Sequence, residues 1–134
     1  MEEFRVLIVD DELDFLETIV KRLQRRKVYA VGVSSGKKAV ELIEQENFDV
    51  AILDVRMPGF DGFDTLREFK KKRPLMEVIM LTGHVSTESG MESLNLGAFD
   101  YVLKPATIDD LLERVQKALE RKAIHEKRTG GTMS

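Results

Sequence analysis

Carboxylates, a hydroxyl and an amine stand directly after short apolar runs of this sequence. These polar residues are Asp10, Asp11, Asp54, Thr82 and Lys104. If the apolar runs are parallel strands of one open sheet, their carboxyl ends meet at one edge, and ligands bind at that edge. The spacing therefore predicts that these five side chains gather at one site.

The carboxylates of this predicted site indicate a cation. Two carboxylates within ~4 Å repel by roughly 4 kcal/mol at an effective dielectric of 20, so a cluster of them needs a positive charge. Mg²⁺ suits such a cluster, because it takes one or two carboxylates together with waters and a phosphate oxygen. Lys104 would add a fixed positive charge. These groups together favour a site that stabilises phosphoryl charge.

Asp54 is the best candidate for a nucleophile at this site. It ends the apolar run Val50–Leu53, which is typical of a strand buried on both faces, where an acid has no structural use. An aspartate can accept a phosphoryl group as an aspartyl phosphate. The adjacent pair Asp10 and Asp11 fits ion binding better, although one of them could cap the helix that is expected near Glu12.

The elements that must position these residues can be read from the periodicity. Runs of strand length alternate with segments of helical period, in which apolar residues recur every three or four positions. The predicted strands are Phe4–Val9, Tyr29–Val33, Val50–Leu53, Val78–Leu81 and Tyr101–Leu103. The predicted helices contain the periodic segments 13–26, 39–43, 63–69, 88–96 and 108–119. Ser34 or Ser35 is the expected N-cap of the second helix. Strict alternation of this kind predicts an α/β fold with a parallel sheet and helices on both faces.

The composition limits the possible classes of protein. The chain has 134 residues, enough for one domain, and a net charge of -3, which gives no general attraction to nucleic acid or to an anionic membrane. It has no cysteine, so we expect no disulfides. Its first strand begins by Phe4, so we expect no signal peptide and a cytoplasmic location. The basic, polar segment from Arg121 onward is expected to fray.

Four motifs resemble the receiver domain of a two-component response regulator. They are VLIVDDE, AILDVRMPGFDG, VIMLTGH and GAFDYVLKPA, and the resemblance extends over residues 4 to about 120. It implies a five-stranded, doubly wound, flavodoxin-like sheet with strand order 2-1-3-4-5. We therefore expect a receiver domain over 4–122, and the composition predicts the end of a helix and a disordered tail over 123–134. Ala106 departs from the bulkier residue that often follows Lys-Pro in the family.

The resemblance assigns a role to each candidate residue. It implies that Asp54 is the phosphoacceptor, that Asp11, Asp54 and the backbone carbonyl of Arg56 bind Mg²⁺, and that Asp10 assists through water. Thr82 and Lys104 would contact the phosphoryl oxygens, and Tyr101 would turn inward when Thr82 moves. Lys104 and Pro105 would be joined by a cis peptide bond. Arg56 and His84 would tune the rate at which the phosphoryl group is lost.

The implied function is a phosphorylation switch and not an enzyme in its own right. A sensor histidine kinase or a phosphotransfer protein would phosphorylate Asp54, and the surface around the fourth helix, the fifth strand and the fifth helix would then control a downstream protein, a fused output domain or a phosphorylation-dependent homodimer. No direct binding of nucleic acid or membrane is expected.

Two alternative functions stay open. The first, a Mg²⁺-dependent phosphatase, normally needs Asp-x-Asp, whereas Arg56 follows Asp54 by two. The second is an interaction module that works without phosphorylation.

Overall fold

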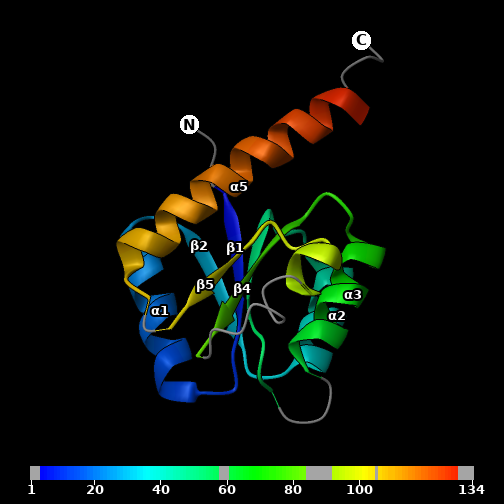
Figure 1. The fold of residues 1–134 in the computed structure, drawn as a ribbon. Helices are drawn as coiled ribbons and strands as arrows, with labels where there is room; N and C mark the ends of the chain where they lie inside the picture. The colour runs from blue at the N-terminus through cyan, green and yellow to red at the C-terminus, as the bar shows by residue number, and fades with distance from the viewer. Residues whose placement is uncertain (1–3, 58–60, 84–91, 105, 130–134) are drawn as a thin grey trace.

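A single parallel sheet forms the centre of the molecule. The computed structural model describes residues 4–57, 61–83, 92–104 and 106–129. The strands are β1 (Arg5–Val9), β2 (Tyr29–Val33), β3 (Val50–Asp54), β4 (Glu77–Thr82) and β5 (Asp100–Leu103), in the order β2-β1-β3-β4-β5 (Figure 1). All neighbouring pairs are parallel. The predicted fold class and strand order are therefore confirmed.

The helices cover both faces of this sheet, as the alternation predicted. They are α1 (Leu13–Arg25), α2 (Gly36–Gln45), α3 (Gly62–Lys72) and α5 (Ile108–Thr129). Residues 92–95 are also helical, within the segment where a fourth helix was expected over 88–96, and residues 84–91 of that segment lie outside the described part. In Figure 1, α1 and α5 lie on one side of the sheet, and α2 and α3 lie on the other.

The apolar strands supply two separate cores, one on each side of the sheet. Successive side chains of a strand point to opposite faces, so Ile8 and Ile52 pack with α1 and α5, whereas Leu7 and Leu53 pack with α2 and α3. Every residue of β3 is buried. The run that ends on Asp54 is thus a central strand covered on both faces, which confirms the prediction made from its composition.

Local sequence signals set where the helices begin. The side chain of Ser35 caps α2 by accepting a hydrogen bond from the backbone N–H of Lys38, so one of the two predicted N-caps is present. Asp61 and Asp64 form a reciprocal capping box at the start of α3. Gly62 begins α3 so close to β3 that an added Cβ would lie 2.3 Å from the carbonyl oxygen of Asp54. Glycine therefore allows α3 to start against the strand that carries this carboxylate.

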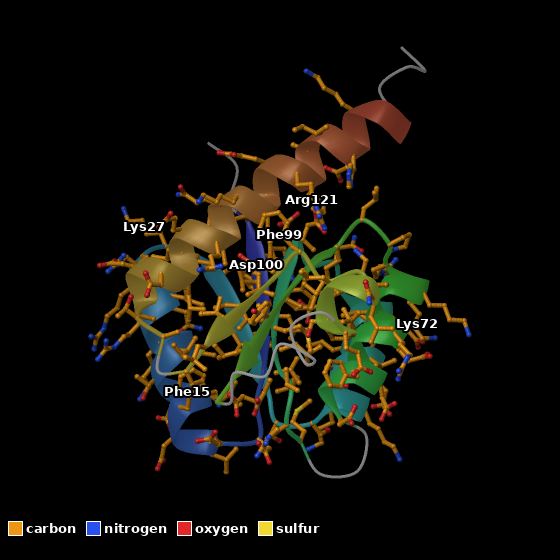
Figure 2. The ribbon with its side chains drawn as sticks, viewed as in Figure 1. Phe15, Lys27, Lys72, Phe99, Asp100 and Arg121 are labelled. Carbon is orange, nitrogen blue, oxygen red and sulfur yellow. The ribbon has the colours of Figure 1, made fainter. Side chains whose placement is uncertain are left out.

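Helix α5 is longer than the periodicity indicated. It remains helical to Thr129, whereas the segment from Arg121 was expected to fray. Tertiary ion pairs explain the difference: Arg121 forms a two-pronged contact with the buried Glu77, and Lys122 pairs with Asp49. Figure 2 shows Arg121 where α5 leaves the sheet, near Phe99. None of the described helices is long and apolar enough to cross a membrane.

Candidate functional site

Three predicted residues meet at the carboxyl edge of the sheet. Asp10 follows β1, Asp54 ends β3, and Lys104 follows β5. The two aspartates are nearly inaccessible, with 1% and 4% of their surface exposed. Adjacent parallel strands β1 and β3 are in register up to Val9 and Leu53, so the next residue of each strand is a buried acid. The convergence of strand ends that the sequence predicted is therefore present for these residues.

Lys104 is held by several groups at once. Its Nζ donates a hydrogen bond to Glu12 Oε1 at 2.8 Å and lies 2.9 Å from Asp10 Oδ2, but it is 3.7 Å from Asp54 Oδ2. It also lies 4.6 Å from the centre of the Phe15 ring. Burial lowers the pKa of Lys104, but the three nearby carboxylates outweigh burial and raise this pKa above its ordinary value. The ammonium therefore stays charged at neutral pH.

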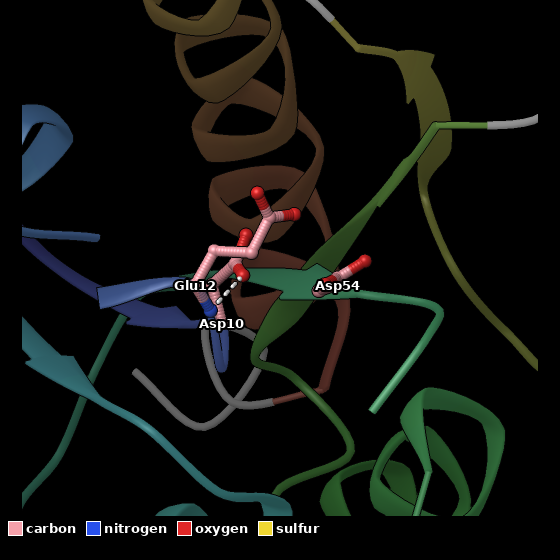
Figure 3. Close-up of side chains that lie close together, drawn as sticks. All are labelled: Asp10, Glu12 and Asp54. Carbon is pink, nitrogen blue, oxygen red and sulfur yellow. Dashed lines mark hydrogen bonds between the residues drawn. The ribbon is translucent and has the colours of Figure 1, made fainter. Parts of the chain in front are cut away.

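Asp10, Glu12 and Asp54 form an acidic cluster. One carboxylate oxygen from each of them lies within 4.8 Å of the others, and Figure 3 shows the three side chains with the hydrogen bond from the Glu12 N–H to Asp10 Oδ1. Among the residues that the structure describes, Asp10 Oδ2 accepts no hydrogen bond of normal geometry. A buried carboxylate oxygen with spare acceptor capacity, next to a second buried carboxylate, fits a hard cation such as Mg²⁺.

The crowding of acids changes the protonation of Asp54. Burial and the charge of Asp10 raise the pKa of Asp54 to about 7, against the lowering effects of Lys104 and of the Arg56 N–H, which donates a hydrogen bond to Asp54 Oδ1 at 3.2 Å. Without a cation, Asp54 therefore keeps its proton to a higher pH than an exposed aspartate does. A bound cation would restore the carboxylate, which is the nucleophilic form.

The remaining predicted residues are not members of the acidic cluster, and some of them lie outside the described part of the structure. Asp11 is exposed and is not in the acidic cluster. Thr82 ends β4 opposite Leu103, and its side chain is outside the described part of the structure. Tyr101 is half-buried on β5 and packs against the core beneath α2 and α3. The predictions for His84 and for the peptide bond to Pro105 lie outside the described residues.

Two site residues were missed by the sequence reasoning. Glu12 was treated as the start of a helix, although it is the third acid of the run Asp10-Asp11-Glu12, which was a usable signal. Phe15 follows Glu12 by three positions, one helical turn further along, and its contact with Lys104 was not anticipated. Both residues approach Lys104 from the start of α1, so their role depends on how that helix packs against the sheet.

The comparisons with known proteins agree with one another. A model of the family described as "Response regulator receiver domain" matches residues 6–116. The chain is 38% identical over 115 residues to "Transcriptional regulatory protein ZraR" of Escherichia coli K12, covering 85% of this chain and 26% of that protein. It is 33% identical over 120 residues to "Regulatory protein AtoC" of the same organism, covering 90% of this chain and 26% of that protein. The chain thus spans about a quarter of the length of these curated relatives.

The solved structures show the same likeness. A CheY-like response regulator receiver domain protein from Methanospirillum hungatei has a TM-score of 0.88 at 32% identity, covering 92% of this chain and 99% of that one. The receiver domain of the Francisella response regulator 1452 has a TM-score of 0.82 at 33% identity, covering 89% and 98% of the two chains. Sequence and fold therefore indicate the same group of proteins.

Proposed function

This chain belongs to the response regulator receiver domain family, and on that premise we propose that Asp54 accepts a phosphoryl group from the phosphohistidine of a sensor kinase or phosphotransfer protein. An Asp54 carboxylate oxygen forms a bond to phosphorus while the bond between phosphorus and the imidazole nitrogen breaks. The histidine nitrogen keeps the electron pair of that bond. The observation that carries the proposal is the pairing of two buried acids with Lys104 at the carboxyl edge of the sheet.

Several residues around Asp54 would stabilise the negative charge of the transferred phosphoryl group. The Arg56 N–H holds Asp54 Oδ1, which leaves Oδ2 facing the Lys104 ammonium. Lys104 is close enough to contact the oxygens of a phosphoryl group on Asp54 and to neutralise their charge. The hydroxyl of Thr82 is the second proposed contact to these oxygens. When bound, Mg²⁺ supplies Lewis-acid neutralisation of the same oxygens. We assign its binding to Asp10, Asp11, Asp54 and the Arg56 carbonyl, with Asp10 acting through water.

We further propose that phosphorylation changes the surface formed by residues 92–104 and α5. Tyr101 is half-buried in this segment, and the apolar side chains of Leu94 and Leu103 are about half exposed. A phosphoryl group adds roughly -1.5 to -2 charges, enough to bias a two-state element by a few kcal/mol. The output is a downstream protein, a second copy of the chain or a fused domain. The last of these fits the two relatives, one named as a transcriptional regulatory protein and the other as a regulatory protein, of which this chain covers about a quarter.

Phosphorylation with a small donor tests the assignment of Asp54. The protein is incubated with acetyl phosphate and Mg²⁺, and its intact mass is measured. We expect a mass gain of one phosphoryl group in the wild type and in the Asp14→Asn control, which changes an exposed acid at the start of α1, but no gain in Asp54→Asn. Wild-type protein that binds Mg²⁺ but is never phosphorylated would favour the phosphorylation-independent interaction module.

A further inference from the structure

Glu12 contacts the site but has no part in the phosphoryl transfer described above. Its carboxylate approaches Lys104 from the start of α1, outside the pair of buried acids. We propose that Glu12 is a positioning residue that holds the Lys104 ammonium away from Asp54 and so keeps the Asp54 oxygen accessible to the cation. This inference rests on the proposed role of Asp54 as cation ligand and phosphoacceptor.

The distances around Lys104 favour this role. Nζ lies 2.8 Å from Glu12 Oε1 and 2.9 Å from Asp10 Oδ2, whereas 3.7 Å separates it from Asp54 Oδ2, beyond hydrogen-bond distance. The Phe15 ring supports the ammonium from the same helix at 4.6 Å. Lys104 is thus drawn toward β1 and α1, and Asp54 Oδ2 is not blocked by a hydrogen bond from it.

The backbone of Glu12 is held firmly enough for this task. Its N–H donates a hydrogen bond to Asp10 Oδ1 at 2.9 Å, and its carbonyl accepts one from the N–H of Leu16 at 2.9 Å, the first hydrogen bond of α1. The Glu12 side chain therefore starts from a point fixed to both the site and the helix. If its charge is removed, Lys104 is left to share two buried acids, and it will move toward Asp54.

The exposure of Glu12 argues against a direct role as a cation ligand. Its side chain is 64% exposed, whereas those of Asp10 and Asp54 are almost fully buried. Mg²⁺ takes only one or two carboxylates and retains several waters, and the direct ligands proposed above, Asp11 and Asp54, already supply that number. Glu12 therefore acts on the cation through Lys104, which would otherwise compete with the cation for Asp54.

A double-mutant cycle separates these two modes of action. Mg²⁺ binding is measured by isothermal titration calorimetry for the wild type, Glu12→Gln, Lys104→Met and the double variant. We expect Glu12→Gln to weaken Mg²⁺ binding about 3- to 10-fold when Lys104 is present and less than about 2-fold when it is Met. Glu41→Gln, a change of the same type at an exposed position of α2, should leave the affinity of the wild type unchanged.

Each other outcome overturns the proposal. Equal weakening in both backgrounds would mean that Glu12 acts on the cation directly, and no weakening in either background would mean that Glu12 does not position Lys104. Phosphorylation by acetyl phosphate gives a second measurement: Glu12→Gln should raise the Mg²⁺ concentration for half-maximal rate but leave the rate at saturating Mg²⁺ within about 2-fold. A wild type that binds Mg²⁺ without Asp54 phosphorylation would refute the proposed function, and the cycle would still decide the role of Glu12.

Discussion

Asp54 lies in surroundings that oppose its own charge. Its pKa of about 7 is well above the ordinary value of 3.8, because the carboxylate is buried beside Asp10. At this position the folded chain therefore binds a proton more tightly than the unfolded chain does, and the contribution of Asp54 to the free energy of unfolding falls as pH rises from about 4 to about 7. In the absence of a cation, the residue proposed to carry the reaction destabilises the fold.

Asp54→Asn should therefore stabilise the cation-free protein, and more so at high pH. The asparagine has no charge to bury, so the gain in unfolding free energy should be larger at pH 8 than at pH 5 by on the order of 2 kcal/mol. Urea denaturation in the presence of a chelator measures both values. The exposed Asp14→Asn control should show a difference that hardly changes between the two pH values, and a gain for Asp54→Asn that does not depend on pH would contradict the burial argument.

For single residues, the sequence predicted which side chains lie close together only where the order of the strands determines it. Asp10, Asp54 and Lys104 could be brought together because each ends a strand of one parallel sheet. Glu12 and Phe15 could not, since their approach to Lys104 depends on side-chain rotamers at the start of α1. Spacing along the chain does not determine such contacts.

Helix α3 begins directly against β3, the strand that carries Asp54. An added Cβ at Gly62 would lie 2.3 Å from the Asp54 carbonyl oxygen and 2.7 Å from Val55 Cα, and both contacts involve backbone that has little freedom to move. The N–H of Gly62 also donates a hydrogen bond to the carbonyl of Val55 at 3.1 Å. The position of α3 therefore fixes the chain just after Asp54, the proposed phosphoacceptor.

Gly62→Ala should destabilise the protein even though alanine favours helix. The expected loss is at least about 2 kcal/mol, because α3 must shift away from β3. Gly83→Ala provides the control, since an added Cβ there meets no described atom within 4 Å, and it should change stability by less than about 1 kcal/mol. Chemical denaturation compares the two variants, and similar losses in both would show that the close approach of α3 to β3 does not matter.

Helix α5 is anchored by ion pairing with Glu77, a buried acid at the edge of the sheet opposite Asp54. Glu77 is only 1% exposed, and Arg121 contacts both of its carboxylate oxygens while Lys70 lies 3.7 Å away. Arg121 also stacks over the Phe99 ring at 4.7 Å. These contacts explain why the basic segment that was expected to fray is helical, since helical period alone carries no information about a distant partner.

Glu77→Gln should loosen the second half of α5. Because it leaves two cations without their buried partner, we expect a loss of roughly 2 kcal/mol in stability, together with faster amide hydrogen exchange over residues 119–129. Lys117→Gln breaks the exposed pair with Glu113 on the same helix and should cost less than about 1 kcal/mol. If exchange in α5 is the same in Glu77→Gln as in the wild type, Glu77 does not hold the helix.

If the acidic site binds a cation as proposed, cation binding and folding of the whole chain are coupled. A cation that binds only the folded chain stabilises it by RT ln(1 + [L]/Kd), which is about 2.7 kcal/mol at 100 times Kd. Protons compete with the cation for Asp54 below its pKa of about 7. The thermal stability of the protein should therefore respond to Mg²⁺ in a pH-dependent way.

Mg²⁺ should raise the Tm of the wild type more at pH 8 than at pH 6. The physical reason is that Asp54 is a carboxylate at pH 8 and largely protonated at pH 6. Calorimetric scans with Mg²⁺ or with chelator measure the shift. Asp54→Asn, which cannot offer the second buried carboxylate, should show a much smaller shift at both pH values, and an equal shift would place the cation elsewhere.

Helix α5 runs beside the sheet from one edge to the other as one continuous rod. Its first turn follows Lys104 at the edge that carries Asp54, and Arg121 forms its ion pair with Glu77 near the opposite edge (Figure 2). The 14 residues from Ile108 to Arg121 span about 20 Å at a rise of 1.5 Å per residue. A stiff element of this length delivers a displacement from one end to the other without relaying it through side chains, so the same helix that borders the site can serve as a mechanical link to the far side of the domain.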